Sequence, residues 1–309
     1  MKRCPITYDE IDTSEEYSAR GLRLLDPQLT RLHPLPYTAL EQRQEALARV
    51  DKISIQGVQL KLSAILNVKE SRFEIVDREG NYILKPPSLD FAQLPENEDL
   101  TMKLASLIGI DVPFHGLAYG KEGALSYFIK RFDRTEESKL PVEDFAQLLG
   151  ESRETKYNSS MEKAVSVIFQ YTTNPAIESK KFFERTLFNF LTGNEDMHLK
   201  NFSLMTLHGK VMLAPAYDLI NTTIVLKKPH EEIALPLAGK KSRLTKEDLL
   251  DYFAQKRLKL SKLTVDAIAN DFIAVLPIWY TMIDRSFLTL ENKTAYRSLL
   301  DQRVGRLLK

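Results

Sequence analysis

The chain has 309 residues, of which 43% are hydrophobic and 28% are charged, a composition typical of a globular protein with one large or two modest domains. Its 43 basic and 42 acidic side chains give a net charge of +1, which argues against direct binding of nucleic acid through a basic surface. Cys4 is the only cysteine, so an intrachain disulfide and a zinc site built from cysteines are excluded. The N-terminus shows no signal peptide, and we expect no apolar run near the roughly 20 residues that cross a bilayer.

Strand patterns dominate residues 53–84, after a polar stretch over residues 38–50 that predicts a helix. Short apolar runs recur there, and Glu79-Gly80-Asn81 supplies a turn between two of them. The last run ends in Lys85. Such a lysine could reach nucleotide phosphates and pair with a carboxylate on the next helix, although this strand taken in isolation favours an ordinary solvent-facing lysine. Glu96 and Glu98 are the candidate partners.

A helix is predicted over residues 96–109, because its leucines share one face and Gly109 follows its end. Two further strands are expected at residues 114–119 and 124–132, and after Pro141 the pattern becomes helical. The simplest fold class is therefore α+β. A strand-rich N-terminal lobe over residues 1–135 would precede a helical C-terminal lobe over residues 136–309.

The strongest chemical signal lies in the segment Gly193-Asn194-Glu195-Asp196-Met197-His198-Leu199-Lys200-Asn201 and in Asp218. A helix predicted to begin at Asn174-Pro175 ends at Gly193, which places Asp196 in a loop. A hairpin around His208-Gly209 separates that loop from Asp218. In phosphoryl transfer one carboxylate orients and deprotonates the acceptor hydroxyl, while an amide oxygen and a second carboxylate bind magnesium. Asp and Asn also form ordinary turns, so it is the order of the elements that favours catalysis.

Taken together, these segments resemble the HipA family of serine/threonine kinase toxins. The resemblance runs from about Ser54 to the last helix and covers, in family order, SIQGVQLK, YILKPP, NEDLTMKLASLIGIDVP, YFIKRFDR, GNEDMHLKNFSL and LAPAYDLI. It implies a two-lobed protein-kinase-like fold. It also implies an enzyme that uses ATP and Mg²⁺ to phosphorylate serine or threonine on a protein.

The resemblance also implies roles for individual residues. Asp196 matches the catalytic aspartate, and His198 matches a position that can touch the transferring phosphate. Asn201 and Asp218 match the magnesium ligands. The ATP-binding positions are Gly57, Val58, Gln59 and Lys61 in the phosphate-covering loop, Lys85 at the phosphates, and Lys130, Arg131 and Phe132 in the hinge beside the adenine. Ser54 matches a serine that family members phosphorylate on themselves. The loop has one glycine and fits neither a Walker A nor a GxGxxG motif.

The expected partners follow from the same resemblance. Only 53 residues precede Ser54, so we expect the short HipT-like type, which lacks the HipA N-terminal subdomain and works with a small HipS-like protein and a HipB-like DNA-binding antitoxin. The expected substrate is an aminoacyl-tRNA synthetase, tryptophanyl or glutamyl, whose phosphorylation would inhibit translation. We expect a bacterial cytoplasmic protein that contacts neither nucleic acid nor membrane, and the sequence leaves secretion as an effector open.

Two other functions compete with this one. A two-lobed kinase fold also serves lipid and small-molecule acceptors. A non-catalytic binding module of a repressor complex is the third alternative, although the presence of Lys85, Asp196, Asn201 and Asp218 argues against it.

Overall fold

The structure is a computed structural model that describes residues 2–49, 59–135, 138–151, 157–226 and 231–308. The chain divides into two compact units. The first comprises Met1–Leu100, Pro113–Arg131 and Asp284–Thr289, and the second comprises Thr101–Val112, Phe132–Ile283 and Leu290–Lys309. The strand expected at residues 53–55 lies outside the described residues, as do Ser54, Gly57 and Val58.

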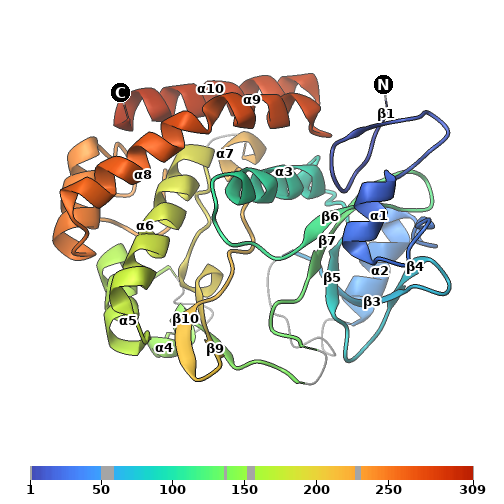
Figure 1. The fold of residues 1–309 in the computed structure, drawn as a ribbon, viewed down its shortest axis with the longest axis horizontal. Coiled ribbons are helices and arrows are strands. Elements are labelled where there is room, and N and C mark those ends of the chain that lie inside the picture. Colours follow the sequence, from blue (N-terminus) through green and yellow to red (C-terminus); the bar gives the residue numbers. More distant parts are fainter. Residues whose placement is uncertain (1, 50–58, 136–137, 152–156, 227–230, 309) are drawn as a thin grey trace. The chain divides into compact units, whose positions relative to one another are not determined.

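The first unit is built on a five-stranded antiparallel sheet with the strand order β4-β3-β5-β7-β6 (Figure 1). The strands are β3 (Leu62–Asn67), β4 (Arg72–Ile75), β5 (Tyr82–Lys85), β6 (His115–Tyr119) and β7 (Leu125–Lys130). Each lies where a strand pattern was expected. In register, Leu62 faces Leu84 and Lys85 faces Tyr127, so the end of β5 is flanked by an aromatic ring.

The N-terminal segment covers one face of this sheet. It contains β1 (Lys2–Arg3), β2 (Glu10–Ile11), α1 (Ala19–Leu25) and α2 (Ala39–Ala48). Ile6, Leu22 and Ala46 join one hydrophobic cluster with Leu84 and Phe128 of the sheet. Burying these apolar side chains on both sides of the contact stabilises the sheet. Of these elements, only the helix at residues 38–50 was predicted.

The helix α3 (Leu94–Leu107) begins in the first unit and ends in the second. It was predicted two residues later in the chain, at residues 96–109. Gly109 has a φ of 89°, a left-handed conformation that suits glycine and follows the end of the helix.

The second unit is mainly helical. Its helices are α4 (Phe145–Leu148), α5 (Met161–Tyr171), α6 (Pro175–Thr192), a 3-10 turn (Leu199–Asn201), α7 (Thr222–Val225), a π-helix (Glu247–Arg257), α8 (Lys262–Ala274), α9 (Leu276–Arg285) and α10 (Leu290–Leu307). Residues Glu247–Arg257 thus form a π-helix rather than an α-helix. A capping pair precedes it, because Thr245 and Asp248 exchange hydrogen bonds of 3.0 and 3.3 Å.

The central helix of this unit is α6, which packs against α5, α10 and β10 (Figure 1). Its ends are those predicted: the Asn174 side chain accepts from the Ile177 N–H, Pro175 occupies the first turn, and Gly193 closes the helix with a φ of 77°. A side chain at Gly193 would also collide with Leu299. The chain therefore leaves α6 sharply at this glycine and enters the loop that carries Asp196.

A three-stranded antiparallel sheet of order β10-β9-β8 completes the second unit. Its strands are β8 (Val142–Asp144), β9 (Ser203–Leu207) and β10 (Lys210–Leu213). The predicted hairpin is β9–β10, whose two loop residues His208 and Gly209 have φ values of 48° and 72°, as in a type I′ turn. The strand β8 was not predicted; it precedes the helices that follow Pro141 and pairs with β9.

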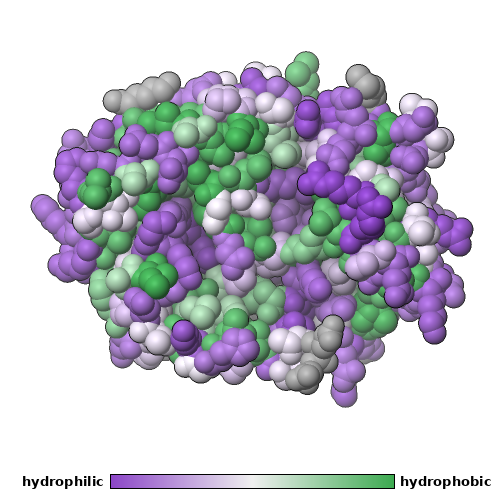
Figure 2. Space-filling model, viewed as in Figure 1, coloured by the Kyte–Doolittle hydropathy of each residue, from purple (hydrophilic) through white to green (hydrophobic). Residues whose placement is uncertain are grey.

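Within the described residues, one segment is long and apolar enough to cross a membrane, Lys262–Arg285, with 24 residues and a mean hydropathy of 1.3. By this measure the expectation that no such stretch exists is wrong. The segment is divided between α8 and α9, and the core helices of many proteins pass the same test, so it is weak evidence for a membrane span. On the face that Figure 2 shows, hydrophobic and hydrophilic side chains are interspersed.

Candidate active site

Lys85, the predicted phosphate-binding lysine, is the last residue of β5 and forms a buried ion pair. Its Nζ lies 2.5 Å from Oε1 of Glu98, and the two side chains are 2% and 0% exposed. The ammonium also lies 5.5 Å from the centre of the Tyr127 ring. The structure therefore selects Glu98 rather than Glu96 as the partner. It also excludes a solvent-facing lysine.

A second buried pair holds the same part of α3. Nδ1 of His115 on β6 lies 2.8 Å from Oδ1 of Asp99, the residue after Glu98. Burial, followed by the neighbouring Asp99 carboxylate, raises the pKa of Tyr8. Because Asp99 is fixed to the sheet through His115, its neighbour Glu98 is held toward Lys85. Sequence reasoning missed Asp99 and His115.

The loop after α6 presents Asp196 on a braced backbone. The Asp196 N–H donates to Oδ1 of Asn194 at 3.2 Å, and Nδ2 of Asn201 donates to the Asp196 carbonyl at 3.0 Å. Asn194 is itself anchored to α6, because its Nδ2 donates to Oδ1 of Asn189 at 3.3 Å. Two side-chain amides thus position the backbone of Asp196, while its side chain stays exposed. This arrangement suits a carboxylate that must meet an incoming group.

Tyr157 contacts both this carboxylate and the ring of His198. The Tyr157 hydroxyl donates a hydrogen bond to Oδ1 of Asp196. The Tyr157 ring meets His198 edge to face, with ring centres 4.9 Å apart and an interplanar angle of 86°. His198 is 5% exposed. Tyr157 was not among the predicted site residues, since 39 positions separate it from Asp196.

The segment that leads to Asp218 is held by two charged side chains of α6. Oε2 of Glu178 accepts from the Leu213 N–H at 3.0 Å, and Nη2 of Arg185 donates to the Ala214 carbonyl at 2.8 Å. Both side chains are buried. Burial lowers the pKa of Arg185 to about 10, so the guanidinium stays charged at neutral pH. The helix that ends in the Asp196 loop therefore also fixes the approach to Asp218.

Asp218 lies next to this loop in a strained conformation. Its φ of 54° is left-handed, which is uncommon for a residue other than glycine and is often found at functional sites. Nδ2 of Asn194 lies 3.5 Å from the Asp218 carbonyl. The preceding Tyr217 bonds Oγ of Ser203 at 2.5 Å and the Lys200 carbonyl at 3.0 Å. The structure thus gathers Asp196, Asn201 and Asp218 in one unit.

The donor set of this loop fits magnesium. Asn201 is 8% exposed and uses its Nδ2 on the Asp196 carbonyl, which leaves its amide oxygen as a hard ligand. Asp218 adds a carboxylate. Among the residues that the structure describes, no group of three or more His, Cys, Asp or Glu is arranged for a metal. Magnesium at nucleotides typically takes one or two protein oxygens and completes its shell with phosphates and water.

The remaining predicted residues fall on other segments. Gln59 and Lys61 lie just before β3 and are partly buried. Lys130 is exposed at the end of β7, and the Arg131 N–H donates to the Asn81 carbonyl at 2.8 Å. Phe132 belongs to the second unit, where it stacks on Tyr217 with ring centres 5.7 Å apart.

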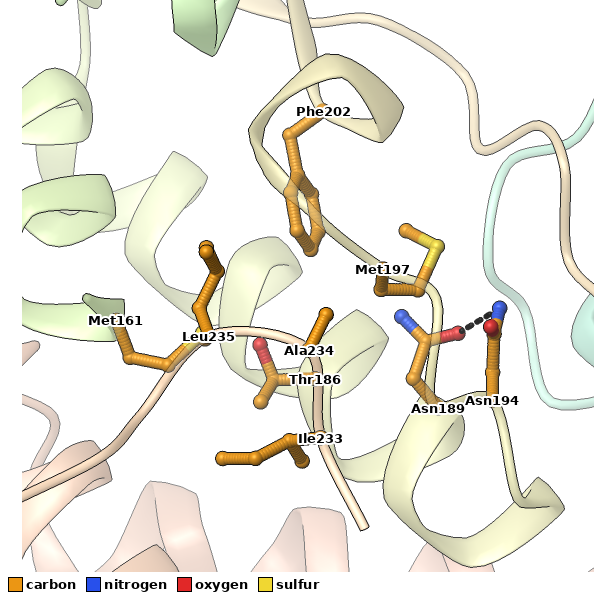
Figure 3. A pocket seen from close by; sticks show the side chains of 9 residues that line it. All are labelled: Met161, Thr186, Asn189, Asn194, Met197, Phe202, Ile233, Ala234 and Leu235. Atoms are coloured by element: carbon orange, nitrogen blue, oxygen red, sulfur yellow. Dashed lines mark hydrogen bonds between the residues drawn. The ribbon is translucent and has the colours of Figure 1, made fainter. Parts of the chain in front are cut away.

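A small pocket lies behind the Asp196 loop in the second unit (Figure 3). Its lining includes Asn189, Asn194 and Met197, and its volume of about 20 Å³ suits one water molecule. Nδ2 of Asn189 is buried there without a hydrogen-bond partner in the described structure, and such a water would supply one. A ligand pocket has roughly 300 Å³ or more, so this pocket serves the loop's packing rather than nucleotide binding.

Comparison with known proteins identifies relatives of this arrangement. Residues 53–279 match the family model described as HipA-like C-terminal domain. The protein Y4dM of Sinorhizobium fredii, provisionally named a kinase, is 33% identical over 78% of this chain and 61% of its own length. A protein of Haemophilus influenzae, also provisionally named a kinase, is 32% identical over 78% of this chain and 74% of its own length. The serine/threonine-protein kinase toxin HipA of Shewanella oneidensis is 30% identical over 55% of this chain, which spans 43% of that toxin.

Two solved structures share the fold. A chain of the Shewanella oneidensis complex of HipA, HipB and operator DNA superposes with a TM-score of 0.69 and 21% identity, over 91% of this chain and 73% of that one. The Helicobacter pylori proinflammatory kinase CtkA gives a TM-score of 0.51 and 17% identity, over 74% of this chain and 87% of that one. The predicted α+β kinase-like fold is confirmed. With the family match over most of its length, the chain belongs to the HipA-like family.

Proposed function

We propose that this chain is an ATP- and Mg²⁺-dependent serine/threonine-protein kinase whose catalytic carboxylate is Asp196. The observation that carries the proposal is the loop itself. Asp196 presents an exposed carboxylate, two side-chain amides fix its backbone by hydrogen bonds, and Asn201 and Asp218 lie in the same unit. The kinase names of the relatives support the reaction class. We take residues 1–135 and 136–309 as the two lobes of this kinase.

Each residue has a defined task in this reaction. Asp196 orients the acceptor hydroxyl and takes its proton, because such transfer needs a base within hydrogen-bond reach. His198, two residues on, would contact the transferring phosphate. Asn201 and Asp218 hold magnesium, which when bound neutralises charge on the nucleotide phosphates. Lys85, kept in place by Glu98, binds the phosphates.

The nucleotide's other contacts are assigned by the family resemblance. The phosphate-covering loop comprises Gly57, Val58, Gln59 and Lys61, and the adenine lies beside Lys130, Arg131 and Phe132. Ser54 is the site of autophosphorylation. A phosphate there adds roughly −1.5 to −2 charges, which would compete with the phosphates of ATP and lower activity.

The cellular role is proposed by analogy with the named relatives. One relative is a HipA toxin, and one structural neighbour belongs to a complex of HipA with HipB and operator DNA. We propose that this chain acts as a bacterial cytoplasmic toxin with HipS-like and HipB-like partners. A tryptophanyl- or glutamyl-tRNA synthetase is the proposed substrate.

The test is transfer of label from [γ-³²P]ATP by the purified chain, with magnesium or with EDTA, to a bacterial lysate and separately to extracted lipids. Magnesium-dependent labelling of protein, mapped to serine or threonine by mass spectrometry, is the expected result. Labelling of lipid or of small molecules alone would replace the protein kinase with the competing acceptor class. Magnesium-ATP binding without transfer to any acceptor would indicate a binding module.

A further inference from the structure

The hydroxyl of Tyr157 occupies a chemically specific position. It donates to Oδ1 of Asp196, whose carboxylate receives the proton of the acceptor hydroxyl in the proposed reaction. The Tyr157 ring lies against His198 at the same time, with ring centres 4.9 Å apart. All three residues belong to the second unit. Tyr157 thus makes two contacts: its hydroxyl forms a hydrogen bond with Asp196, and its ring packs against His198.

An acceptor hydroxyl needs the same hydrogen bond. Before transfer, the serine or threonine hydroxyl must donate to the catalytic carboxylate within hydrogen-bond reach. The phenol of Tyr157 is also a hydroxyl, and it already makes that bond. Burial and the Asp196 carboxylate raise the pKa of Tyr157, so at neutral pH the phenol keeps its proton and acts as the donor.

We propose that Tyr157 fills the acceptor-hydroxyl subsite as an internal stand-in, and that an acceptor protein must displace it to reach Asp196. The proposal rests on the kinase function proposed above and deepens it. It assigns the acceptor subsite to the two groups that Tyr157 contacts, the Asp196 carboxylate and the His198 ring. Tyr157 then restricts phosphorylation to acceptor proteins that can displace it.

Displacement requires no unfolding of the core. Tyr157 is 39% exposed and lies in the short segment before α5. The first turn of α5 is capped separately, because Oγ of Ser160 accepts from the Lys163 N–H at 3.3 Å. A hydrogen bond between an exposed carboxylate and a partly exposed phenol competes with water, so its net strength is modest.

The decisive variant is Tyr157→Phe, which removes the hydroxyl and keeps the ring beside His198. The matched control is Tyr171→Phe, since Tyr171 is 38% exposed in the same unit and its hydroxyl only meets the Leu148 carbonyl at 3.4 Å. Two probes are used: dephosphorylated casein as a serine-rich acceptor, and water through magnesium-ATP hydrolysis. KM and kcat are measured for each.

For Tyr157→Phe we expect the KM for casein to fall about tenfold and ATP hydrolysis to rise by a similar factor. The KM for ATP and the melting temperature should stay unchanged, and Tyr171→Phe should match the wild type. An unchanged casein KM and hydrolysis rate would overturn the proposal. A tenfold lower kcat at constant KM would also overturn it, because Tyr157 would then assist Asp196. If the wild type and both variants transfer no phosphate to casein, to water or to any protein of a bacterial lysate, the kinase function itself fails.

Discussion

Variants of the buried pair Lys85–Glu98 distinguish the pair's contribution to protein stability from its role in catalysis. Glu98→Gln removes one charged partner of an ammonium that is 2% exposed, and breaking a buried ion pair by removing one partner typically costs about 3–5 kcal/mol. The double variant Lys85→Met/Glu98→Leu replaces both charges with apolar groups of similar size. Such replacements are often neutral for stability, so the double variant should recover most of the loss. It should still fail to use ATP, because the phosphates have lost their lysine.

The assay is urea unfolding followed by circular dichroism, with magnesium-ATP binding measured on the same samples. Trp279 fluorescence is unsuitable here, because this tryptophan lies in the second unit and the pair lies in the first. Arg72→Gln is the control, since the Arg72–Glu74 pair is 43% and 32% exposed and should contribute less than about 1 kcal/mol. If Glu98→Gln lowers the free energy of unfolding no more than Arg72→Gln does, the pair is not buried as described. If the double variant binds ATP like the wild type, Lys85 has no role at the phosphates.

Three further outcomes are expected. Arg185→Gln should lower kcat by about a hundredfold with little change in the KM for ATP, because displacing the segment before Asp218 by about 1 Å is enough for such a loss. Glu178→Gln keeps an oxygen for the Leu213 N–H and should lose much less activity. Equal losses in the two variants would refute this account of the α6 contacts. Burial raises the pKa of Glu96 to about 7, so its contribution to stability is full below the unfolded value of 4.5 and is lost as the pH rises through 7. Glu96→Gln should therefore flatten the fall in urea midpoint between pH 5 and pH 8, and an unchanged slope would contradict the assignment. Ser54→Ala should abolish most self-labelling, as measured by mass spectrometry, while keeping transfer to protein. Self-labelling that persists at other residues would exclude Ser54 as the autophosphorylation site.

Local signals predicted the elements that local physics determines. The ends of α6 followed from Asn174-Pro175 and Gly193, because capping residues and left-handed glycines act on their own neighbours. The hairpin at His208-Gly209 followed for the same reason. The short strand β8 carried no comparable signal, since it owes its conformation to pairing with β9. The π-helix likewise shares its apolar pattern with an α-helix.

The site was predictable only in part. Asp196, Asn201 and Asp218 were found because they lie within a short stretch of chain with a recognisable order. Sequence spacing could not choose between Glu96 and Glu98, which follow Lys85 at similar separations. The contacts of Tyr157 with Asp196 and of Asp99 with His115 join residues 39 and 16 positions apart. Such contacts depend on how the elements pack, and no local pattern encodes them.

The central claim is tested most directly by one comparison of phosphoryl transfer. Wild type, Asp196→Asn and Asp271→Asn are incubated with magnesium and [γ-³²P]ATP, and label on protein is counted over time. Asp271 is an exposed carboxylate of α8 in the same unit, so its variant controls for loss of a surface charge. The account predicts that Asp196→Asn loses transfer by a thousandfold or more while its melting temperature and that of the control match the wild type. Transfer by Asp196→Asn at a rate near that of Asp271→Asn would contradict it.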